Sequence, residues 1–345
     1  MVEKLLSICI STYNRCDECV RLVQSIVALK DSRYNVVVCD DASTDNTTGR
    51  LRELVQDNLI IKTNKRNLGP CKNWYNTIDS GTGKYILHVL DRDTINILQL
   101  HSLLDILEKC EISGGYIGLS AIEASIEKQI GHKVYLYKLG KEAFLYMGGV
   151  PVHPTGFIVC RMFWKECQSK KYFYLTEKYG IYPHSYVMAY MALKGDMLYI
   201  PANFYSYKYT GKNSESRFYQ SYKGKRNFWW TPVSVEQTAM KLLFYLYPYA
   251  DSDYQERFIV RRFGDGLYRA TVSYKETVSN KAEMAHYGVN ARTISYVELL
   301  VTGIWYYCLF TKGMDRFYTG DVKKMKRELR RSWRKIMSCV LRNKR

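Results

Sequence analysis

Two pairs of carboxylates follow apolar segments of this sequence and are its residues best suited to chemistry. Asp40 and Asp41 come directly after Asn35–Cys39, and Asp91 and Asp93 come directly after Tyr85–Leu90. Adjacent carboxylates at the end of a buried strand are costly unless they meet partners. Such acceptors can take the imide N–H of a pyrimidine and the hydroxyls of a ribose, and carboxylates at i and i+2 can converge on Mg²⁺ or Mn²⁺. A divalent ion there would bridge a bound diphosphate and offset its developing charge.

Each motif also has a purely structural explanation. Ser43 or Asp45 could cap a helix, with acidic residues near its positive end, but capping does not explain the pair Asp40 and Asp41. The second motif could be an exposed acidic turn in which Arg92 is a local partner. A D-x-D pattern often occurs by chance. The apolar strand before it, and the acidic pair after another strand, favour a metal site.

The elements that must position these residues alternate between short apolar runs and segments of helical period. Because strands and helices alternate, the sequence predicts an α/β fold with a mainly parallel sheet and helices on both faces. Ligands of such sheets lie beyond the carboxyl ends of the strands, where both acidic pairs and Asn14-Arg15 fall. The predicted strands are Leu5–Thr12, Asn35–Cys39, Leu59–Thr63 and Tyr85–Leu90, and the predicted helices are Cys19–Leu29, Asp45–Val55, Pro70–Asp79 and Ile95–Cys110.

The composition and the apolar periodicity of the sequence change further along the chain. Tyrosine becomes dense after about residue 145, and the pattern is helical after about residue 232, most clearly in Gln237–Tyr247 and Val297–Phe310. We therefore predict one domain over 1–230, with a nucleotide-binding part (1–110) and an acceptor-side part (111–230). A helical C-terminal region (231–345) is expected to follow.

The composition is that of a soluble globular protein, with 47% hydrophobic and 24% charged residues in 345. No secretion signal and no bilayer-spanning run is found, so we expect a cytoplasmic protein whose ten cysteines are reduced. Cys16 and Cys19 form a C-x-x-C without a second such pair. We interpret them as neighbours on a helix rather than as half of a zinc site.

The net charge of +18 is unevenly distributed. Residues 1–110 carry as many acidic as basic side chains, whereas 323–345 carry 11 basic residues and one acidic residue. Met325, Leu329, Trp333, Ile336 and Val340 recur there at helical spacing, which predicts a basic amphipathic helix on an anionic membrane surface or a terminal helix docked on its own domain. A nucleic-acid-binding protein is the alternative from another class. The neutral first third and the strand-end carboxylates argue against it, so no nucleic acid is expected.

In its first third the sequence resembles the family 2 glycosyltransferases, which have the Rossmann-like GT-A fold. The resemblance depends on the order and spacing of four motifs, Ser11–Arg15, Asp40–Asp45, Asn67–Pro70 and Gly83–Asp93. It implies inverting transfer of a sugar, in a single displacement, from a nucleotide sugar to a hydroxyl of another sugar. UDP is the usual nucleotide of the family, and dTDP and GDP stay open.

The resemblance also implies roles for individual residues. Asp91 would lie on the ribose side and Asp93 would bind Mg²⁺ or Mn²⁺, with Asp91 as a further candidate ligand. Asp41 would meet the base, with Asp40 beside it. The remaining expected donor contacts are Thr12, Tyr13 and Arg15 near the nucleotide, and Lys72 and Asn73 after the Asn-Leu-Gly-Pro turn.

An inverting enzyme needs a general base to take the proton of the attacking hydroxyl. Family members usually supply an Asp or Glu from the second half of the domain, and this sequence has no clean match. We predict His184 first, because histidine has a suitable pKa, and Glu177 second. His184 could equally be a residue at the start of a helix. The segment His153–Gly156 is expected to line the acceptor side or simply to lead into a strand.

The resemblance and the basic tail together predict an enzyme of surface-polysaccharide synthesis, such as capsule or O-antigen assembly. Its acceptor would be a lipid-linked sugar at the inner face of the cell membrane. The alternative within the family is a protein that has lost catalysis and only binds. The absence of a clear general base favours this alternative, and the intact pair Asp91 and Asp93 argues against it.

Overall fold

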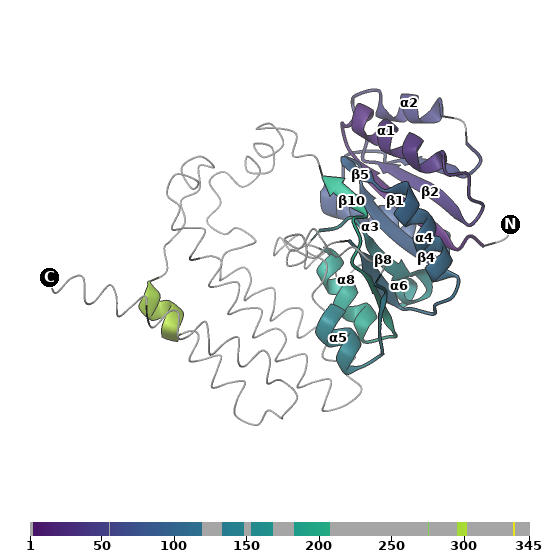
Figure 1. Ribbon diagram of the computed structural model, residues 1–345. Coiled ribbons are helices and arrows are strands. Elements are labelled where there is room, and N and C mark those ends of the chain that lie inside the picture. The colour runs from purple at the N-terminus through teal and green to yellow at the C-terminus, as the bar shows by residue number, and fades with distance from the viewer. Residues whose placement is uncertain are drawn as a thin grey trace. The chain divides into compact units, whose positions relative to one another are not determined.

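The computed structural model describes residues 3–54, 56–118, 133–147, 153–167 and 183–207, together with 275, 295–301 and 334. The chain divides into two compact units, one formed by Met1–Lys178 with Tyr182–Tyr209 and the other by Tyr179–Ile181 with Thr210–Arg345. The labelled strands and helices all belong to the first unit (Figure 1). The predicted border at residue 230 lies outside the described residues and stays a prediction.

Four parallel strands form the first half of the main sheet. They are β1 (Leu6–Thr12), β2 (Tyr34–Asp40), β3 (Leu59–Thr63) and β4 (Tyr85–Leu90), in the spatial order β3-β2-β1-β4. The register sets Thr12 beside Asp40 and Ser11 beside Leu90. The carboxyl ends of β1, β2 and β4 therefore meet at one edge of the sheet, which is the arrangement that the sequence predicts.

The second half of the sheet is mixed. β8 (Phe157–Cys160) lies antiparallel to β4 and is followed by β6 (Gly114–Ile117), β9 (Met197–Ile200) and β7 (Tyr135–Tyr137). Because β8 runs against both β4 and β6, the latter two strands point the same way. The predicted mixed and mainly parallel sheet is confirmed.

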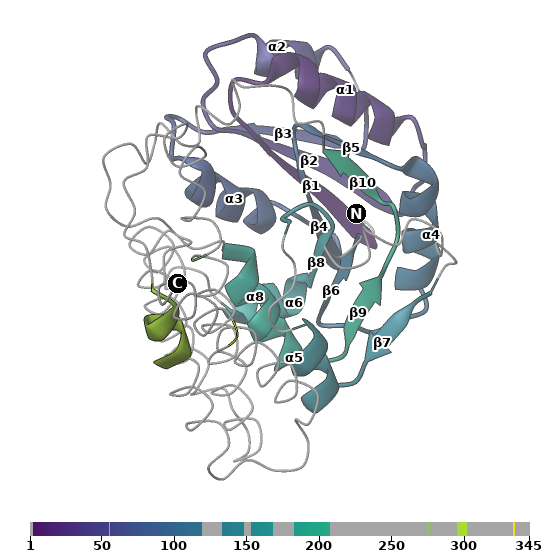
Figure 2. The ribbon, with the colours of Figure 1, turned by 60° about the vertical axis from the view of Figure 1, so that its left-hand side comes forward.

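Helices cover both faces of this sheet (Figure 2). On one face, α1 (Cys16–Val27) and α4 (Ile97–Leu107) share a buried apolar cluster with alternate residues of β1, β2 and β4. α2 (Thr47–Arg52) packs against α1 and β3. On the other face, aromatic side chains of α3 (Pro70–Asp79) and α6 (Arg161–Cys167) pack together over β4 and β8. α8 (Pro183–Ala192) contacts β6 and β8, and α5 (Lys141–Met147) contacts α8.

A small second sheet changes one predicted element. β5 (Asp93–Ile95) pairs antiparallel with β10 (Tyr205–Tyr207), so the helix predicted from Ile95 begins only at Ile97. The Asn96 side chain caps it by accepting hydrogen bonds from the amides of Leu98 and Gln99. The apolar periodicity before Ile97 was misleading because the partner strand comes from a distant part of the chain. Asp93 is thereby the first residue of a strand, paired with Tyr207.

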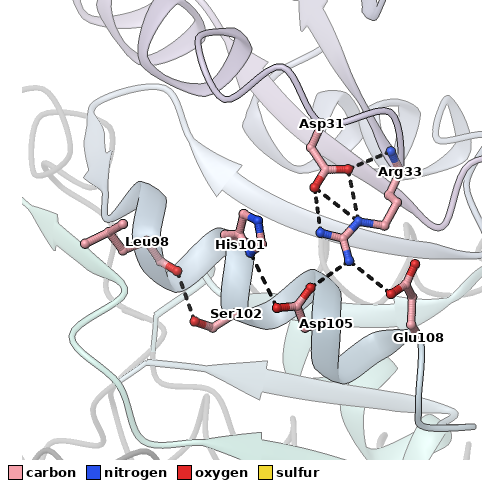
Figure 3. Close-up of polar contacts among 7 residues, drawn as sticks. All are labelled: Asp31, Arg33, Leu98, His101, Ser102, Asp105 and Glu108. Carbon is pink, nitrogen blue, oxygen red and sulfur yellow. Dashed lines mark hydrogen bonds and ion pairs between the residues drawn. The ribbon is translucent and has the colours of Figure 1, made fainter.

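Arg33 joins the segment before β2 to α4 (Figure 3). Its guanidinium donates to Asp31 at 2.6 Å, to Asp105 at 2.7 Å and to Glu108 at 3.0 Å. These bonds hold the pKa of Asp31 and of Asp105 below the usual value for aspartate. The network fixes the amino-terminal edge of the sheet, opposite the acidic pairs.

Within the described residues, no helix is both long and apolar enough to cross a membrane. The eight described cysteines are free thiols, including Cys16 and Cys19 in the first turn of α1. The tail 323–345, predicted to be a basic amphipathic helix, lies outside the described residues except for Arg334.

Candidate active site

The acidic residues gather at the carboxyl ends of β1, β2 and β4. Thr12 ends β1, Asp40 ends β2 and Asp91 follows β4, and the Asp41 amide donates to the Thr12 carbonyl at 2.9 Å. These four residues and Asp93 are buried. Buried carboxylates need nearby partners, and the partners differ from one aspartate to the next.

Arg15 is the cationic partner of Asp91. Its Nε lies 3.7 Å from Asp91 Oδ2, and its side chain stays 30% exposed whereas that of Asp91 is nearly covered. Burial raises the pKa of Asp91, and the Arg15 charge opposes that rise. A partly exposed guanidinium beside a buried carboxylate can still bind an anionic ligand, such as a phosphate.

Asp40 stabilises the loop between β2 and α2. Its carboxylate accepts hydrogen bonds from the Ser43 amide at 3.1 Å, the Ser43 hydroxyl and the Thr48 hydroxyl at 2.9 Å. The Ser43 hydroxyl oxygen in turn accepts from the Asn14 amide at 2.8 Å. The structure therefore gives Asp40 a role inside the protein, and its predicted contact with the donor stays a prediction.

The loops after β1 and β2 are tied to each other. Asn14 has a left-handed backbone with φ of 51°, which asparagine tolerates better than most residues. Its side-chain oxygen accepts from the Thr44 amide at 2.7 Å, and Asp45 accepts from the Cys16 amide at 3.1 Å. These bonds fix the backbone on both sides of Arg15 before any ligand arrives.

Asp41 holds the turn that precedes α3. One carboxylate oxygen accepts from the Leu68 amide and from the Asn64 side chain, at 2.9 and 2.8 Å, and the other accepts from the Gly69 amide at 2.9 Å. Gly69 has a φ of 87°, and Pro70 begins the helix. Two of the resembling motifs, Asp40–Asp45 and Asn67–Pro70, thus bind each other. One acceptor position on the second oxygen is left for a ligand.

The other predicted donor contacts differ in exposure. Asn73 is buried and donates to the Cys39 carbonyl at 3.0 Å while accepting from Asn64 at 2.9 Å, so it supports the strand ends from inside. Tyr13 is exposed and Lys72 is half-buried. Both lie in segments next to the aspartates, where a ligand could reach them.

Asp93 binds Thr155, a residue far from it in the sequence. Its Oδ2 accepts a hydrogen bond from the Thr155 hydroxyl, whose oxygen accepts from the Leu90 amide at 3.0 Å. Its Oδ1 is buried and has no hydrogen-bond partner in the described part of the chain. Burial is the main cause that raises the pKa of Asp93 to about 6.

His153 lies beside the same carboxylate. Its Nδ1 is 3.7 Å from Asp93 Oδ2, and its ring stacks on Tyr205 with 4.7 Å between centroids. The Thr155 amide donates to Nδ1 at 3.3 Å, so that nitrogen carries no proton and the ring is neutral. Burial lowers the pKa of His153 to about 4. The segment His153–Gly156 therefore borders Asp93.

Asp91 and Asp93 are carboxylates of the kind that binds a hard divalent cation when the cation takes its other ligands from the substrate. No group of three His, Cys, Asp or Glu side chains with metal-binding geometry occurs among the described residues. Mg²⁺ commonly binds one or two carboxylates and completes its shell with phosphates and water. The buried Oδ1 of Asp93, which has no hydrogen-bond partner, is the acceptor that such an ion would use.

Of the two predicted general bases, the structure describes only His184. His184 is the second residue of α8 and is buried, with its ring 6.3 Å from that of Phe157 on β8. Glu177 lies outside the described residues. Both roles stay predictions.

Comparison with known proteins gives one family match. Residues 7–145 match the family model described as glycosyl transferase family 2, which covers all four motifs and both acidic pairs. Residues 7–145 are therefore similar to the family 2 glycosyltransferases. No curated protein matches the sequence.

The chain is similar in fold to a crystal structure of S. aureus TarS. One TarS structure shares 16% identity and a TM-score of 0.51 over 88% of this chain and 48% of that chain. Another, TarS 1–349 in complex with UDP-GlcNAc, shares 14% identity and a TM-score of 0.45 over 85% of this chain and 90% of that chain. This chain thus spans about half the length of the first TarS structure.

Proposed function

We propose that the protein transfers a sugar from a nucleotide sugar, with UDP as the first candidate nucleotide, to a hydroxyl of another sugar with inversion. The observation that carries this proposal is the placement of Asp91 and Asp93 at the end of β4, with Arg15 3.7 Å from Asp91 and within the family-matched segment. Both a guanidinium and a hard metal ion can stabilise the negative charge of a nucleoside diphosphate. Arg15 supplies the first and Asp93 can bind the second.

Different residues of the chain would bind the nucleoside, hold the metal ion and accept the proton. Thr12, Tyr13, Asp41 and Lys72 would contact the nucleoside, and the loops tied together around Arg15 would lower the entropic cost of binding it. Asp93, with Asp91, would hold Mg²⁺ or Mn²⁺, which stabilises the negative charge of a leaving diphosphate. His184 or Glu177 would accept the proton of the attacking hydroxyl.

Calorimetry tests the donor half of this proposal. UDP, dTDP, GDP and CDP are titrated into wild type and Asp93→Asn, each with and without Mn²⁺. We expect Mn²⁺-dependent binding of one nucleoside diphosphate, strongest for UDP, and its loss in the variant. Ser113→Ala is the matched control. Ser113 has a buried, hydrogen-bonded hydroxyl and lies directly before β6, away from the strand ends that carry the acidic pairs. Failure of the folded wild type to bind any of the four would overturn the proposal.

The general base needs a separate test on donor turnover. His184→Ala or Glu177→Gln should lower turnover by roughly 10²- to 10⁴-fold while leaving nucleotide binding unchanged. The variant that shows this split identifies the base. If both variants turn over as wild type does, neither residue is the base.

We further propose that the acceptor is a lipid-linked sugar of capsule or O-antigen assembly and that the enzyme works at the cytoplasmic face of the membrane. The support is the basic, Trp-containing sequence of 323–345. Deletion of this tail should abolish flotation with anionic liposomes and leave nucleotide binding intact. Unchanged flotation would exclude the tail as a membrane anchor.

A further inference from the structure

His88 is a buried polar residue of β4 that none of the roles above uses. Its side chain is fully covered, with its ring 5.7 Å from that of Trp74. One ring nitrogen, Nε2, lies 3.3 Å from the Ser11 hydroxyl of β1, and the other, Nδ1, lies 3.2 Å from the Pro154 carbonyl oxygen. A fully buried imidazole with two such contacts must have a defined proton position.

The two contacts fix the tautomer of His88. A carbonyl oxygen can only accept a hydrogen bond, so Nδ1 carries the proton and donates to Pro154. Nε2 then has a lone pair and accepts from the Ser11 hydroxyl. The ring is neutral, as expected where burial lowers the pKa of His88 to about 3. His88 therefore connects β1 with the segment before β8.

The backbone around His88 holds the same segment. The Gly156 amide donates to the His88 carbonyl at 3.0 Å, and the Gly156 carbonyl accepts from the Ile117 amide at 2.9 Å. Between Pro154 and Gly156 stands Thr155, whose hydroxyl accepts from the Leu90 amide and donates to Asp93. Thr155 is fully buried, so this hydroxyl has a fixed place.

We propose that Thr155 is a positioning residue that turns the Asp93 carboxylate so that Oδ1 faces a divalent cation, and that His88 fixes the backbone carrying Thr155. The inference rests on the proposed function of Asp93 as a metal ligand. A carboxylate with one oxygen bound to a fixed donor cannot rotate freely, and its second oxygen keeps one direction. Residues that orient a metal ligand in this way typically change metal affinity by roughly 10- to 100-fold.

The test compares three variants by calorimetric binding of UDP to the full chain, with and without Mn²⁺. Thr155→Val keeps the shape of the side chain but cannot donate, and it should weaken Mn²⁺-dependent UDP binding by roughly 10- to 100-fold. Thr155→Ser keeps the hydroxyl and should bind as wild type does. Ser113→Ala also removes a buried hydroxyl, but at the amino-terminal end of β6, and it should leave binding unchanged. Metal-free UDP binding should be the same in all three.

A second pair of variants tests His88. Asparagine places its amide N–H near the position of Nδ1, so His88→Asn should preserve Mn²⁺-dependent UDP binding, whereas His88→Leu should weaken it as Thr155→Val does. Circular dichroism confirms that each variant is folded.

The outcomes separate this inference from the proposed function. If wild type binds UDP with Mn²⁺, Asp93→Asn does not, and Thr155→Val binds as wild type does, the positioning role is overturned while the proposed function stands. Equal losses in Thr155→Val and Thr155→Ser would also overturn it, because the hydroxyl would not be the cause. Absence of Mn²⁺-dependent binding in wild type would overturn both.

Discussion

Thr155 donates a hydrogen bond to Asp93 although the two residues are 62 positions apart in the sequence. Thr155 precedes β8 and Asp93 begins β5, so the bond joins the main sheet to the small one. It is the single hydrogen bond to this carboxylate among the described residues, and Oδ1 is left buried without a partner. Asp93 is therefore a carboxylate whose ionised form the folded protein stabilises poorly.

The first prediction concerns the cost of keeping Asp93 ionised. Burial raises its pKa from the ordinary 3.8 to about 6. Between these pH values the folded protein holds a proton that the unfolded chain has lost, so stability falls as pH rises from about 4 to 6 and stays lower above it. The free energy of unfolding of Asp93→Asn, relative to that of wild type, should therefore rise by roughly 1–3 kcal/mol from pH 4 to pH 8.

Urea unfolding of the metal-free proteins at pH 4 and pH 8 measures this difference. Because Asp93→Asn should also lose Mn²⁺-dependent nucleotide binding, a gain in stability would accompany a loss of function, as is common at active sites. If the stability difference between variant and wild type is the same at both pH values, the raised pKa is not real.

His88 should have a pH dependence of the opposite sign. Burial lowers its pKa from 6.5 to about 3, so below pH 6.5 the unfolded chain binds a proton that the folded protein does not. This group therefore contributes a loss of stability as pH falls, with a slope of about 1.4 kcal/mol per pH unit. His88→Asn cannot titrate and should lose about 2 kcal/mol less than wild type between pH 7 and pH 5. Urea unfolding at these two pH values gives the comparison, and parallel wild-type and variant profiles would contradict it.

Much of the site's placement follows from local sequence. The strands before Asp40 and Asp91 are apolar runs, and their ends share an edge because parallel strands all end on the same side. The observed strands β1 to β4 begin and end within one residue of the predicted ones. α1 begins three residues earlier than predicted. α2 begins two residues later than predicted, at Thr47, because Asp45 accepts from the Thr47 amide and lies before the helix.

The sequence did not predict which distant segments contact the acidic residues of the site. Asp93 pairs with Tyr207 and binds Thr155, and Asp41 binds the Leu68 and Gly69 amides. Each contact depends on tertiary register, which periodicity does not encode. A weak signal existed for Thr155, since His153-Pro154-Thr155-Gly156 precedes an apolar run. The signal indicated a loop or strand lead-in and gave no partner.

Gly156 provides a third prediction, because two independent features exclude a side chain there. Its φ is 93°, and a Cβ would lie 2.0 Å from the Ile117 carbonyl oxygen. Gly156→Ala should therefore cost about 2–4 kcal/mol, the sum of backbone strain and overpacking. It should also displace Thr155 and weaken Mn²⁺-dependent nucleotide binding.

Gly140 is the matched control for this substitution. Its φ is 103°, but among the described residues no heavy atom beyond its chain neighbours lies within 4 Å of the Cβ position. Gly140→Ala should show only the backbone cost, about 1–2 kcal/mol, with normal nucleotide binding. Thermal unfolding and calorimetry on the two variants make the comparison. Equal losses of stability would mean that the Ile117 carbonyl yields to the new side chain.

The last prediction concerns the Arg33 network at the opposite edge of the sheet (Figure 3). The planar guanidinium of Arg33 reaches Asp31, Asp105 and Glu108 at once, and its side chain is 21% exposed. Lysine has the charge but not the fork geometry. Arg33→Lys should therefore lower the free energy of unfolding by about 1 kcal/mol without affecting nucleotide binding.

The stability difference between Arg33→Lys and wild type should shrink at high salt and at low pH. Ionic screening weakens partly exposed pairs, so the loss should shrink in 1 M NaCl by comparison with low salt. The pKa of Asp31 and of Asp105 lies below the ordinary value, so their contribution is present above about pH 4 and disappears as pH falls through the lowered values. The control is Arg50→Lys at the pair with Asp17, where no measurable change is expected because both side chains are exposed to solvent. A loss in Arg33→Lys that persists in high salt would indicate that the arginine acts through packing of its stem against α4 rather than through its charge.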